Sequence, residues 1–286
     1  LFRSGAFEAC SLAEEVLLKL HPNWHIHTAA WTGGGTDFCR SLTRAYFGRV
    51  EPQAVLGASL MPVEAEIGWV ECARLPEAVR STLGLRAAGQ VAIIEAASAL
   101  GAGKVDGSDT ALGRSSYGLG QLIGRAADAG AEAILLGLGD AATLDLGLGA
   151  LQAVGLEVIG EASGLIPRLV PSMWAEVVRL RGELWPHIPP VIAVADGTFP
   201  LLGPNGAVMK SGPEKGLKPG QLVETERLAG KIAKLLGDFF EQPRNRLAER
   251  YAGQGGGLGL GLAVGLDARI HEAAEIVPAW LGLDGT

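Results

Sequence analysis

Acidic residues follow apolar runs that are typical of buried strands. Asp196 comes directly after the uncharged run 191–195. In open α/β sheets, ligands bind beyond the carboxyl ends of the strands. A carboxylate placed there can hold a metal ion or accept a proton as a general base, and it can equally cap a turn. Asp196 is therefore a candidate catalytic residue.

Two glycine-rich turns have the composition of anion-binding loops. The first is Gly33-Gly34-Gly35-Thr36, between an expected strand and an expected helix, and the second is Gly255-Gly256-Gly257, before another helix. Backbone N–H groups at the start of a helix bind phosphate oxygens, and glycine lets the ligand come close. The alternative is a tight turn that only packs a helix against the sheet. Both turns are candidate phosphate-binding sites.

A lysine and a third glycine motif extend this chemistry. Lys215 lies in the turn 212–216, where its charge could neutralise a phosphate. Gly139 belongs to the motif Gly137-Leu138-Gly139-Asp140-Ala141-Ala142, and Glu157 follows twenty residues after Gly137. This G-x-G-x-x-A pattern also occurs in dinucleotide-binding proteins, which leaves a dinucleotide enzyme as an alternative. Asp140 speaks against that alternative, since it would place a negative charge beside the pyrophosphate.

The expected elements place these residues at strand ends. Helices are expected over 7–20, 37–47, 117–129, 145–154, 219–241 and 253–264, and strands over 24–31, 54–60, 64–73, 90–97, 133–138 and 191–195. The helix 219–241 is indicated by an apolar stripe with charged residues between its members. Alternating strands and helices predict right-handed crossovers and a parallel sheet.

Composition restricts the class of protein. The 286 residues include 42 glycines in irregular runs, and 48% of the residues are hydrophobic, which excludes collagen and disorder. A net charge of −7 argues against binding to nucleic acid. Three widely spaced cysteines predict no disulfide framework, and we expect a cytoplasmic protein without a signal peptide or membrane span.

Several segments together resemble the bacterial glycerate kinase family, which phosphorylates D-glycerate with ATP and magnesium. The order and spacing agree across nearly the whole chain. The matching segments are 115–123 with T-T-Y-G-T-G-E-L-I, 137–147 with G-I-G-G-S-A-T-N-D-G-G, 200–207 with P-L-L-G-P-N-G-A, 212–216 with G-P-x-K-G, and 253–259 with G-A-A-G-G-L-G.

The resemblance implies a fold and a set of functional residues. It implies two Rossmann-like or mixed α/β domains with a cleft between them, a discontinuous first domain of residues 1–52 plus 242–286 and a second domain of residues 53–241. ATP and Mg²⁺ would be the cofactors, and a small hydroxy acid the substrate, with a homodimer left open. The implied catalytic residues are Asp196, Asp145 and Lys215, of which Asp196 and Asp145 would bind metal. Implied phosphate- or substrate-binding residues are Arg3, Ser4, Gly33, Gly34, Gly35, Thr36, Gly139, Asn205, Gly255, Gly256 and Gly257.

The chain departs from the family pattern at polar positions. The family's D-S-F-K-G is represented by Phe2-Arg3-Ser4, and A-D-G-G-E-G-T by the segment 31–36, which lacks both acids. Leu144 replaces an asparagine, and only Asp196 and Pro200 remain of C-D-V-D-N-P. Carboxylates that hold Mg²⁺ cannot be replaced by apolar groups without loss. A catalytically impaired relative that binds a metabolite or a partner is therefore the alternative function.

Overall fold

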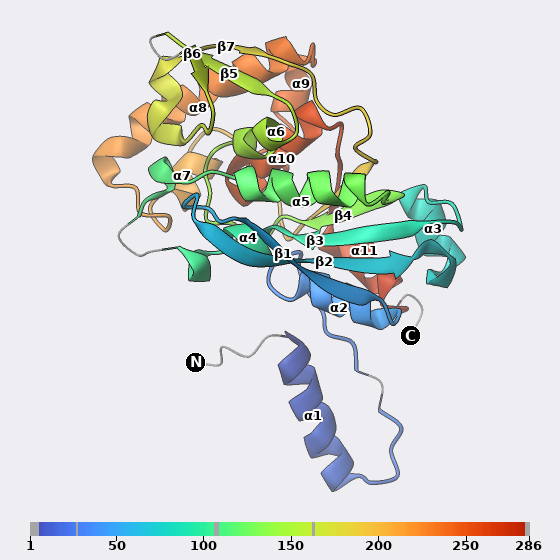
Figure 1. Cartoon of the computed structure of the whole chain (residues 1–286). Coiled ribbons are helices and arrows are strands. Elements are labelled where there is room, and N and C mark those ends of the chain that lie inside the picture. The colour runs from blue at the N-terminus through green and yellow to red at the C-terminus, as the bar shows by residue number, and fades with distance from the viewer. Residues whose placement is uncertain (1–5, 27, 106–108, 162–163, 284–286) are drawn as a thin grey trace.

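Six strands form the central sheet in the computed structural model, which describes residues 6–26, 28–105, 109–161 and 164–283. The strand order is β1-β2-β3-β4-β8-β9. Their bounds are β1 (Arg49–Leu56), β2 (Pro62–Glu71), β3 (Gln90–Glu95), β4 (Ala133–Gly137), β8 (Val191–Ala195) and β9 (Arg269–Glu272). The sheet, covered by helices, confirms the expected mixed α/β fold (Figure 1).

The sheet is parallel in one half and antiparallel in the other. β3, β4, β8 and β9 run parallel to one another, whereas β1 and β2 form an antiparallel pair, and β2 also pairs antiparallel with β3. β4 and β8 are buried along their whole length. Such strands are continuous apolar runs because both faces of the sheet are covered. The carboxyl ends of β3, β4 and β8 therefore lie along one edge of the sheet.

A smaller sheet and a long helix form a second core. This sheet has the order β6-β5-β7, with β5 (Glu157–Gly160), β6 (Gly164–Ile166) and β7 (Val177–Arg181). Against it packs α8 (Pro219–Phe239), through the buried Ile232 and Leu236. The expected apolar stripe is thus the buried face of this helix.

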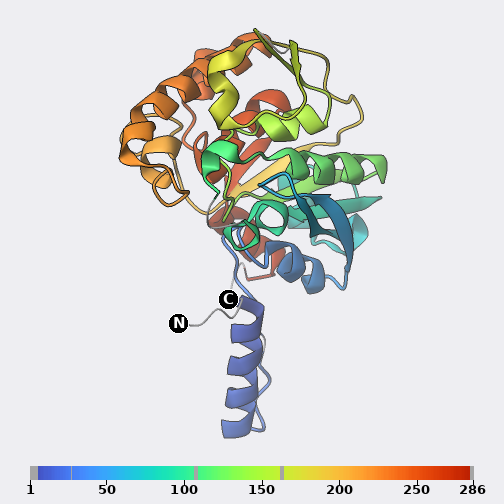
Figure 2. The same cartoon turned by 60° about the vertical axis from the view of Figure 1, so that its left-hand side comes forward.

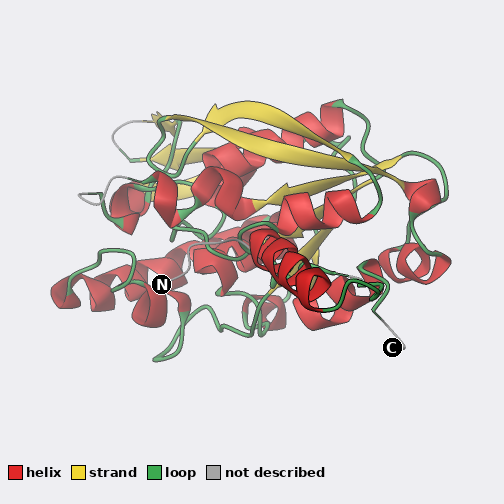
Figure 3. Ribbon diagram, turned by 90° about the horizontal axis from the view of Figure 1, so that it is seen from below, coloured by secondary structure: helices red, strands yellow, loops and turns green. Residues whose placement is uncertain are grey.

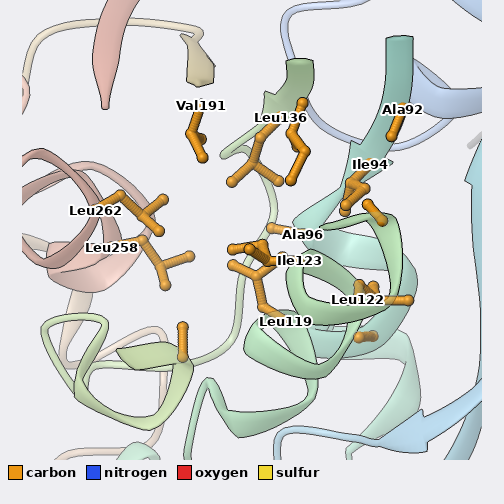
Figure 4. Packing of buried hydrophobic residues seen from close by; sticks show 14 of the residues in the cluster. Ala92, Ile94, Ala96, Leu119, Leu122, Ile123, Leu136, Val191, Leu258 and Leu262 are labelled. Atoms are coloured by element: carbon orange, nitrogen blue, oxygen red, sulfur yellow. The ribbon is translucent and has the colours of Figure 1, made fainter. Parts of the chain in front are cut away.

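Helices cover both faces of the central sheet. Besides α8, the helices of the described residues are α1 (Ala6–Leu20), α2 (Phe38–Ala45), α3 (Glu77–Leu83), α4 (Ala96–Leu100), α5 (Tyr117–Asp128), α6 (Leu148–Ala153), α7 (Ala207–Ser211), α9 (Arg244–Leu247), α10 (Gln254–Gly265) and α11 (Ala273–Trp280), of which α1 lies away from the sheet. On one face, Leu119, Leu122 and Ile123 of α5 pack with Ile94 and Leu136 (Figure 4). On the other face, α2 and α11 pack through Phe38, Leu42 and Trp280.

The expected strand at 24–31 is absent from the described residues, and the expected division into two domains cuts through the central sheet. The described residues of 24–31 form no strand, because no neighbouring strand pairs with them. Residue 52, the expected end of the first domain segment, lies inside β1, and β9 pairs with β8 across the expected division. The two-domain division stays a prediction.

The N-terminal helix α1 stands apart from the central sheet. Figures 1 and 2 show it extending away from the rest of the chain, and it lies nearest to the viewer in Figure 3. Among the described residues, no helix is both long and apolar enough to cross a bilayer.

Candidate functional site

A cavity of about 1030 Å³ lies at the carboxyl ends of β3, β4 and β8. Thr36, Asp196 and the turn Gly255–Gly256 all contribute to its wall, as do Gly139 and Lys215. The structure thus brings together segments that are far apart in the sequence.

Other predicted site residues lie elsewhere. Asn205 is exposed and does not line the cavity, and neither does Gly257. Gly33, Gly34 and Gly35 do not line the cavity either, and a Cβ built on Gly33 would be 3.0 Å from the Cβ of Asp196. Arg3 and Ser4 lie outside the described residues. Their proposed contact with phosphate stays a prediction.

Asp145 organises the interior instead of facing the cavity. Its side chain has 0% exposure, and its Oδ2 accepts hydrogen bonds from the Ser116 N–H at 2.6 Å and the Ser116 Oγ at 2.8 Å. The N–H groups of Gly147 and Gly149 donate to the same carboxylate. Burial raises the pKa of this carboxyl. Because its oxygens are occupied inside the core, Asp145 is not placed to hold a metal ion at the cavity.

The turn at 33–36 is closed by a carboxylate of the chain itself. The N–H and the Oγ1 of Thr36 both donate to Oδ2 of Asp140, each at 3.0 Å. A Cβ built on Gly35 would lie 2.3 Å from that same oxygen. Gly34 has φ +95° and comes too close to Val194 for a side chain. The glycines therefore allow Asp140, not an external anion, to reach the donors of Thr36.

The turn at 255–257 has a different neighbourhood. All three glycines have positive φ, of +62°, +75° and +90°. A Cβ on Gly256 would lie 2.0 Å from the carbonyl oxygen of Thr143 and 2.9 Å from Nζ of Lys215. With their positive φ, the three residues are not helical themselves, and the regular helical part of α10, whose N-terminal end carries partial positive charge, follows them. Here the nearest charged group is a cation.

Two cations lie beside this second turn. Nζ of Lys215 donates to the carbonyl of Thr143 at 2.7 Å, and Nη1 of Arg114 donates to the carbonyl of Ala142 at 3.2 Å. Arg114 has only 5% exposure and also pairs with Asp109, whose Oδ2 is 3.6 Å from its Nε. Burial, followed by repulsion from Arg114, lowers the pKa of Lys215 to about 8. We call Arg114, Lys215 and Gly255–Gly256 the cationic side of the cavity.

Asp196 is held by a buried amide. Its Oδ1 accepts a hydrogen bond from Nε2 of Gln254, the first residue of α10. The Oε1 of Gln254 is buried and has no hydrogen-bond partner among the described residues. Gln254 thus fixes Asp196 at the point where β8 ends.

A buried carboxyl group faces the cavity from β3. Glu95 is the last residue of β3, has 7% exposure, and accepts a hydrogen bond from the Cys39 N–H at 3.2 Å. Burial raises its pKa to about 7, and the nearby carboxylates of Asp37, Glu66 and Asp140 contribute. We call these four acids the acidic side of the cavity.

The charges of the wall decide how a polyanion could bind. Seven acidic and four basic side chains line the cavity, namely Asp37, Glu64, Glu66, Glu95, Asp140, Asp196 and Glu214 against Arg40, Lys104, Arg114 and Lys215. An anion with several charges needs a further cation in such a wall. Within the described part of the chain, no three His, Cys, Asp or Glu side chains are grouped to hold a metal. Mg²⁺ in phosphoryl-transfer sites is usually bound by one or two carboxylates and by phosphate oxygens of the substrate. Asp196 could supply the carboxylate, and a bound nucleotide would supply the phosphate oxygens.

The dinucleotide alternative finds no support in the geometry. Glu157 lies in β5 of the smaller sheet, where its Oε2 accepts a hydrogen bond from Nε of Arg181. It does not line the cavity. A carboxylate that binds the ribose hydroxyl of a dinucleotide would have to lie at the carboxyl ends of the parallel strands.

Sequence reasoning missed Glu95, Arg114 and Gln254. Glu95 could have been found by the rule that identified Asp196, because it follows an apolar strand in the same way. Gln254 is the first residue of α10 and directly precedes the predicted turn 255–257, which could have drawn attention to it. Arg114 reaches the cavity from a loop, and its sequence context carried no signal.

Comparisons with known proteins agree on one family. The profile of the Glycerate kinase family matches residues 4–286. A glycerate kinase from Bacillus subtilis (strain 168) is 30% identical over 289 residues, which cover 96% of this chain and 68% of that protein. A glycerate kinase from Haemophilus influenzae is 34% identical, covering 95% of this chain and 68% of that protein. The crystal structure assigned to glycerate kinase 2 from Salmonella typhimurium LT2 matches with a TM-score of 0.79 and 26% identity, over 97% of this chain and 71% of that chain.

Proposed function

The chain belongs to the glycerate kinase family, and we propose that it transfers a phosphoryl group from ATP to D-glycerate or a related small hydroxy acid. The observation that carries this proposal is the cavity, in which Asp196, Lys215 and the turn Gly255–Gly256 meet. Phosphoryl transfer depends on positioning and on charge neutralisation. Asp196 supplies a carboxylate for the reacting hydroxyl group or for a metal ion, and Lys215 and the turn supply a cation and a glycine cradle that can hold an anionic group of a reactant.

Asp196 is positioned as expected for the carboxylate that would act on the substrate hydroxyl group or on the metal ion. It lies at the carboxyl end of β8, and Gln254 holds one of its oxygens in place. From there it would accept the proton of the attacking hydroxyl group or provide an oxygen ligand to Mg²⁺. The metal would supply neutralisation of the phosphate charge, which the four basic side chains of the wall leave incomplete.

A coupled assay of ADP release tests this proposal. We expect turnover with ATP, Mg²⁺ and D-glycerate, and a loss of about 100-fold or more in Asp196→Asn. Asp238→Asn is the matched control, because Asp238 is exposed on α8 and does not line the cavity. Folded wild-type protein with no turnover above background would refute the proposal.

A binding protein without turnover is the second candidate function. The observation that favours it is the pairing of Thr36 with Asp140, which removes two donors from the cavity. Calorimetry that finds tight binding of ADP or D-glycerate, together with no ADP release in the assay, would select this function over the first.

We also propose a reducing compartment such as the cytoplasm, where ATP is available. Cys10, Cys39 and Cys72 are free thiols, and Cys39 and Cys72 are buried. Whether the chain forms a homodimer would be measured by sedimentation.

A further inference from the structure

Arg114 and Lys215 reach the cavity from different loops and are held side by side. Consecutive carbonyl groups, those of Ala142 and Thr143, accept their hydrogen bonds at 3.2 and 2.7 Å. Both side chains line the cavity. Holding two like charges next to each other in a half-buried wall is unfavourable unless an anion joins them.

The chain itself neutralises these two cations only in part. Asp109 pairs with Arg114, but its Oδ2 also accepts a hydrogen bond from Ser59 at 2.7 Å, and Nε of Arg114 is buried with no hydrogen-bond partner among the described residues. The hydrogen-bond partner of Lys215 is a neutral carbonyl.

Three charged groups act on Lys215, and none is a direct partner. Asp145 attracts it but is occupied by the donors around Ser116, Glu214 attracts it weakly, and Arg114 repels it. The balance leaves its pKa at about 8. The positive charge of Lys215 is therefore only partly neutralised by the chain, and an anion bound in the cavity could pair with it.

The glycine turn leaves room for the lysine. A Cβ on Gly256 would lie 2.9 Å from Nζ of Lys215, so a side chain there would displace the ammonium group. Gly255 and Gly256 also line the cavity at the start of α10. Two cations and a left-handed glycine turn thus converge on one corner of the cavity.

We propose that Arg114, Lys215 and the Gly255–Gly256 turn form an oxyanion subsite that binds the carboxylate of the hydroxy-acid substrate. The identity of this ligand rests on the proposed function. Asp109 beside Arg114 and Glu214 on the same wall offset the charges of the two cations. A site with so little excess positive charge suits a singly charged carboxylate that is held by directed donors better than a phosphate chain with several negative charges.

Proton-linked calorimetry with D-glycerate tests this subsite. At pH 8 a lysine with a pKa of about 8 is half protonated, and a bound carboxylate would raise that pKa. We expect titrations in two buffers of different ionisation enthalpy to show uptake of about half a proton per D-glycerate at pH 8. The uptake should fall towards zero at pH 6, where Lys215 is already charged.

Variants assign this proton to Lys215. We expect Lys215→Met to abolish the proton uptake and to weaken the binding of D-glycerate by about tenfold or more. Arg114→Gln should weaken the binding of D-glycerate to a similar extent. The affinity for ADP should change by less than about threefold in both variants. Lys104→Met is the matched control, because Lys104 also lines the cavity and donates to carbonyls, those of Glu64 and Ser98. Lys104→Met should keep the proton uptake of the wild type. As a ligand control, glycerol, which lacks the carboxylate, should bind to the wild type at least about tenfold more weakly than D-glycerate.

The outcomes separate this inference from the proposed function. If Lys215→Met weakens ADP and leaves D-glycerate unchanged, the pair binds nucleotide phosphate and the inference is wrong. Uptake that persists in Lys215→Met would place the proton on another group, such as Glu95, and would also overturn it. Proton-linked D-glycerate binding without any ADP release would support the subsite while refuting the kinase. If Arg114→Gln does not fold, Lys215→Met and Arg114→Lys still decide the question.

Discussion

The two glycine turns that border the cavity are alike in sequence and opposite in charge environment. At 33–36, the carboxylate of Asp140 receives the N–H and the hydroxyl of Thr36. At 255–257, the side-chain atom nearest to a Cβ built on Gly256 is Nζ of Lys215, a cation. One turn is filled by an anion of the chain itself, whereas the other is bordered by cations.

This difference shows what glycine does and does not determine. Glycine permits a close approach of backbone to any group, because it has no Cβ. The group that arrives is chosen by residues far away in the chain, since 104 residues separate Thr36 from Asp140. A glycine cluster therefore predicts a tight cradle, and only the fold decides what occupies it.

The largest expected effect is that of Gly256→Ala. With φ at +75° and a Cβ 2.0 Å from the carbonyl oxygen of Thr143, the alanine meets backbone that cannot move aside. We expect a loss of more than about 3 kcal/mol in the free energy of unfolding, measured by urea denaturation. Gly103→Ala is the control in the same cavity, because nothing lies within 4 Å of its Cβ. A Gly256→Ala protein as stable as this control would show that the second turn is not constrained.

The next effect concerns the acidic side of the cavity, where Glu95 is held with a pKa of about 7. A carboxyl group whose pKa is raised on folding binds more protons in the folded state, so the free energy of unfolding falls as pH rises from about 4.5 to 7. We expect Glu95→Gln to be more stable than the wild type by about 3 kcal/mol at pH 8 and equally stable near pH 4.5. Urea denaturation at both pH values measures this.

Glu66→Gln is the control for Glu95→Gln, because its expected effect on the free energy of unfolding at pH 8 has the opposite sign. Arg40 donates to both oxygens of Glu66, at 2.7 and 2.5 Å, and lowers the pKa of that carboxyl. Its contribution is present at pH 8 and is lost as pH falls through the lowered pKa, so this variant should be less stable than the wild type at pH 8. A Glu95→Gln protein that behaves like Glu66→Gln would show that Glu95 is not destabilised by burial.

Much of this fold could be predicted from local sequence. The apolar runs that became β4 and β8, and the stripe of α8, carry their own evidence of burial. The expected strand at 24–31 failed because a strand is defined by its partner, which a sequence window does not contain. The antiparallel β1–β2 pair at one edge of the sheet also depends on pairing between separate segments.

The site was predictable where it depends on strand ends and not where it depends on side-chain partners. Asp196 was found because it follows β8. The spacing of Asp145 could not show that its side chain is buried and accepts a hydrogen bond from the Ser116 N–H without lining the cavity, and its predicted role in metal binding stays a prediction. Arg114 was missed because its position beside Lys215 is set by two carbonyl groups that only the fold brings near.

Gly35→Ala tests how firmly the first turn is closed, and its effect should be smaller than that of Gly256→Ala. Its Cβ would meet Oδ2 of Asp140 at 2.3 Å, but that atom ends a movable side chain. We expect a loss of about 1–2 kcal/mol, the cost of disturbing the hydrogen bonds to Thr36. Urea denaturation measures it, and a loss as large as that of Gly256→Ala would mean that the two turns are equally rigid.

The smallest effect on stability, and the sharpest test of the comparison, is that of Asp140→Gly. This change removes two hydrogen bonds to Thr36, but it also relieves a non-glycine residue at φ +57°, so the free energy of unfolding should change by less than about 1 kcal/mol. It frees the two donors of Thr36 and removes a negative charge from the wall. We therefore expect ADP to bind several-fold more tightly in calorimetry at low ionic strength, an advantage that added salt reduces. Thr36→Val in the Asp140→Gly background removes the freed hydroxyl and should reverse part of the gain. If Asp140→Gly binds ADP no better than the wild type, the first turn is a packing element even when open, and the closing carboxylate is not what separates the two turns.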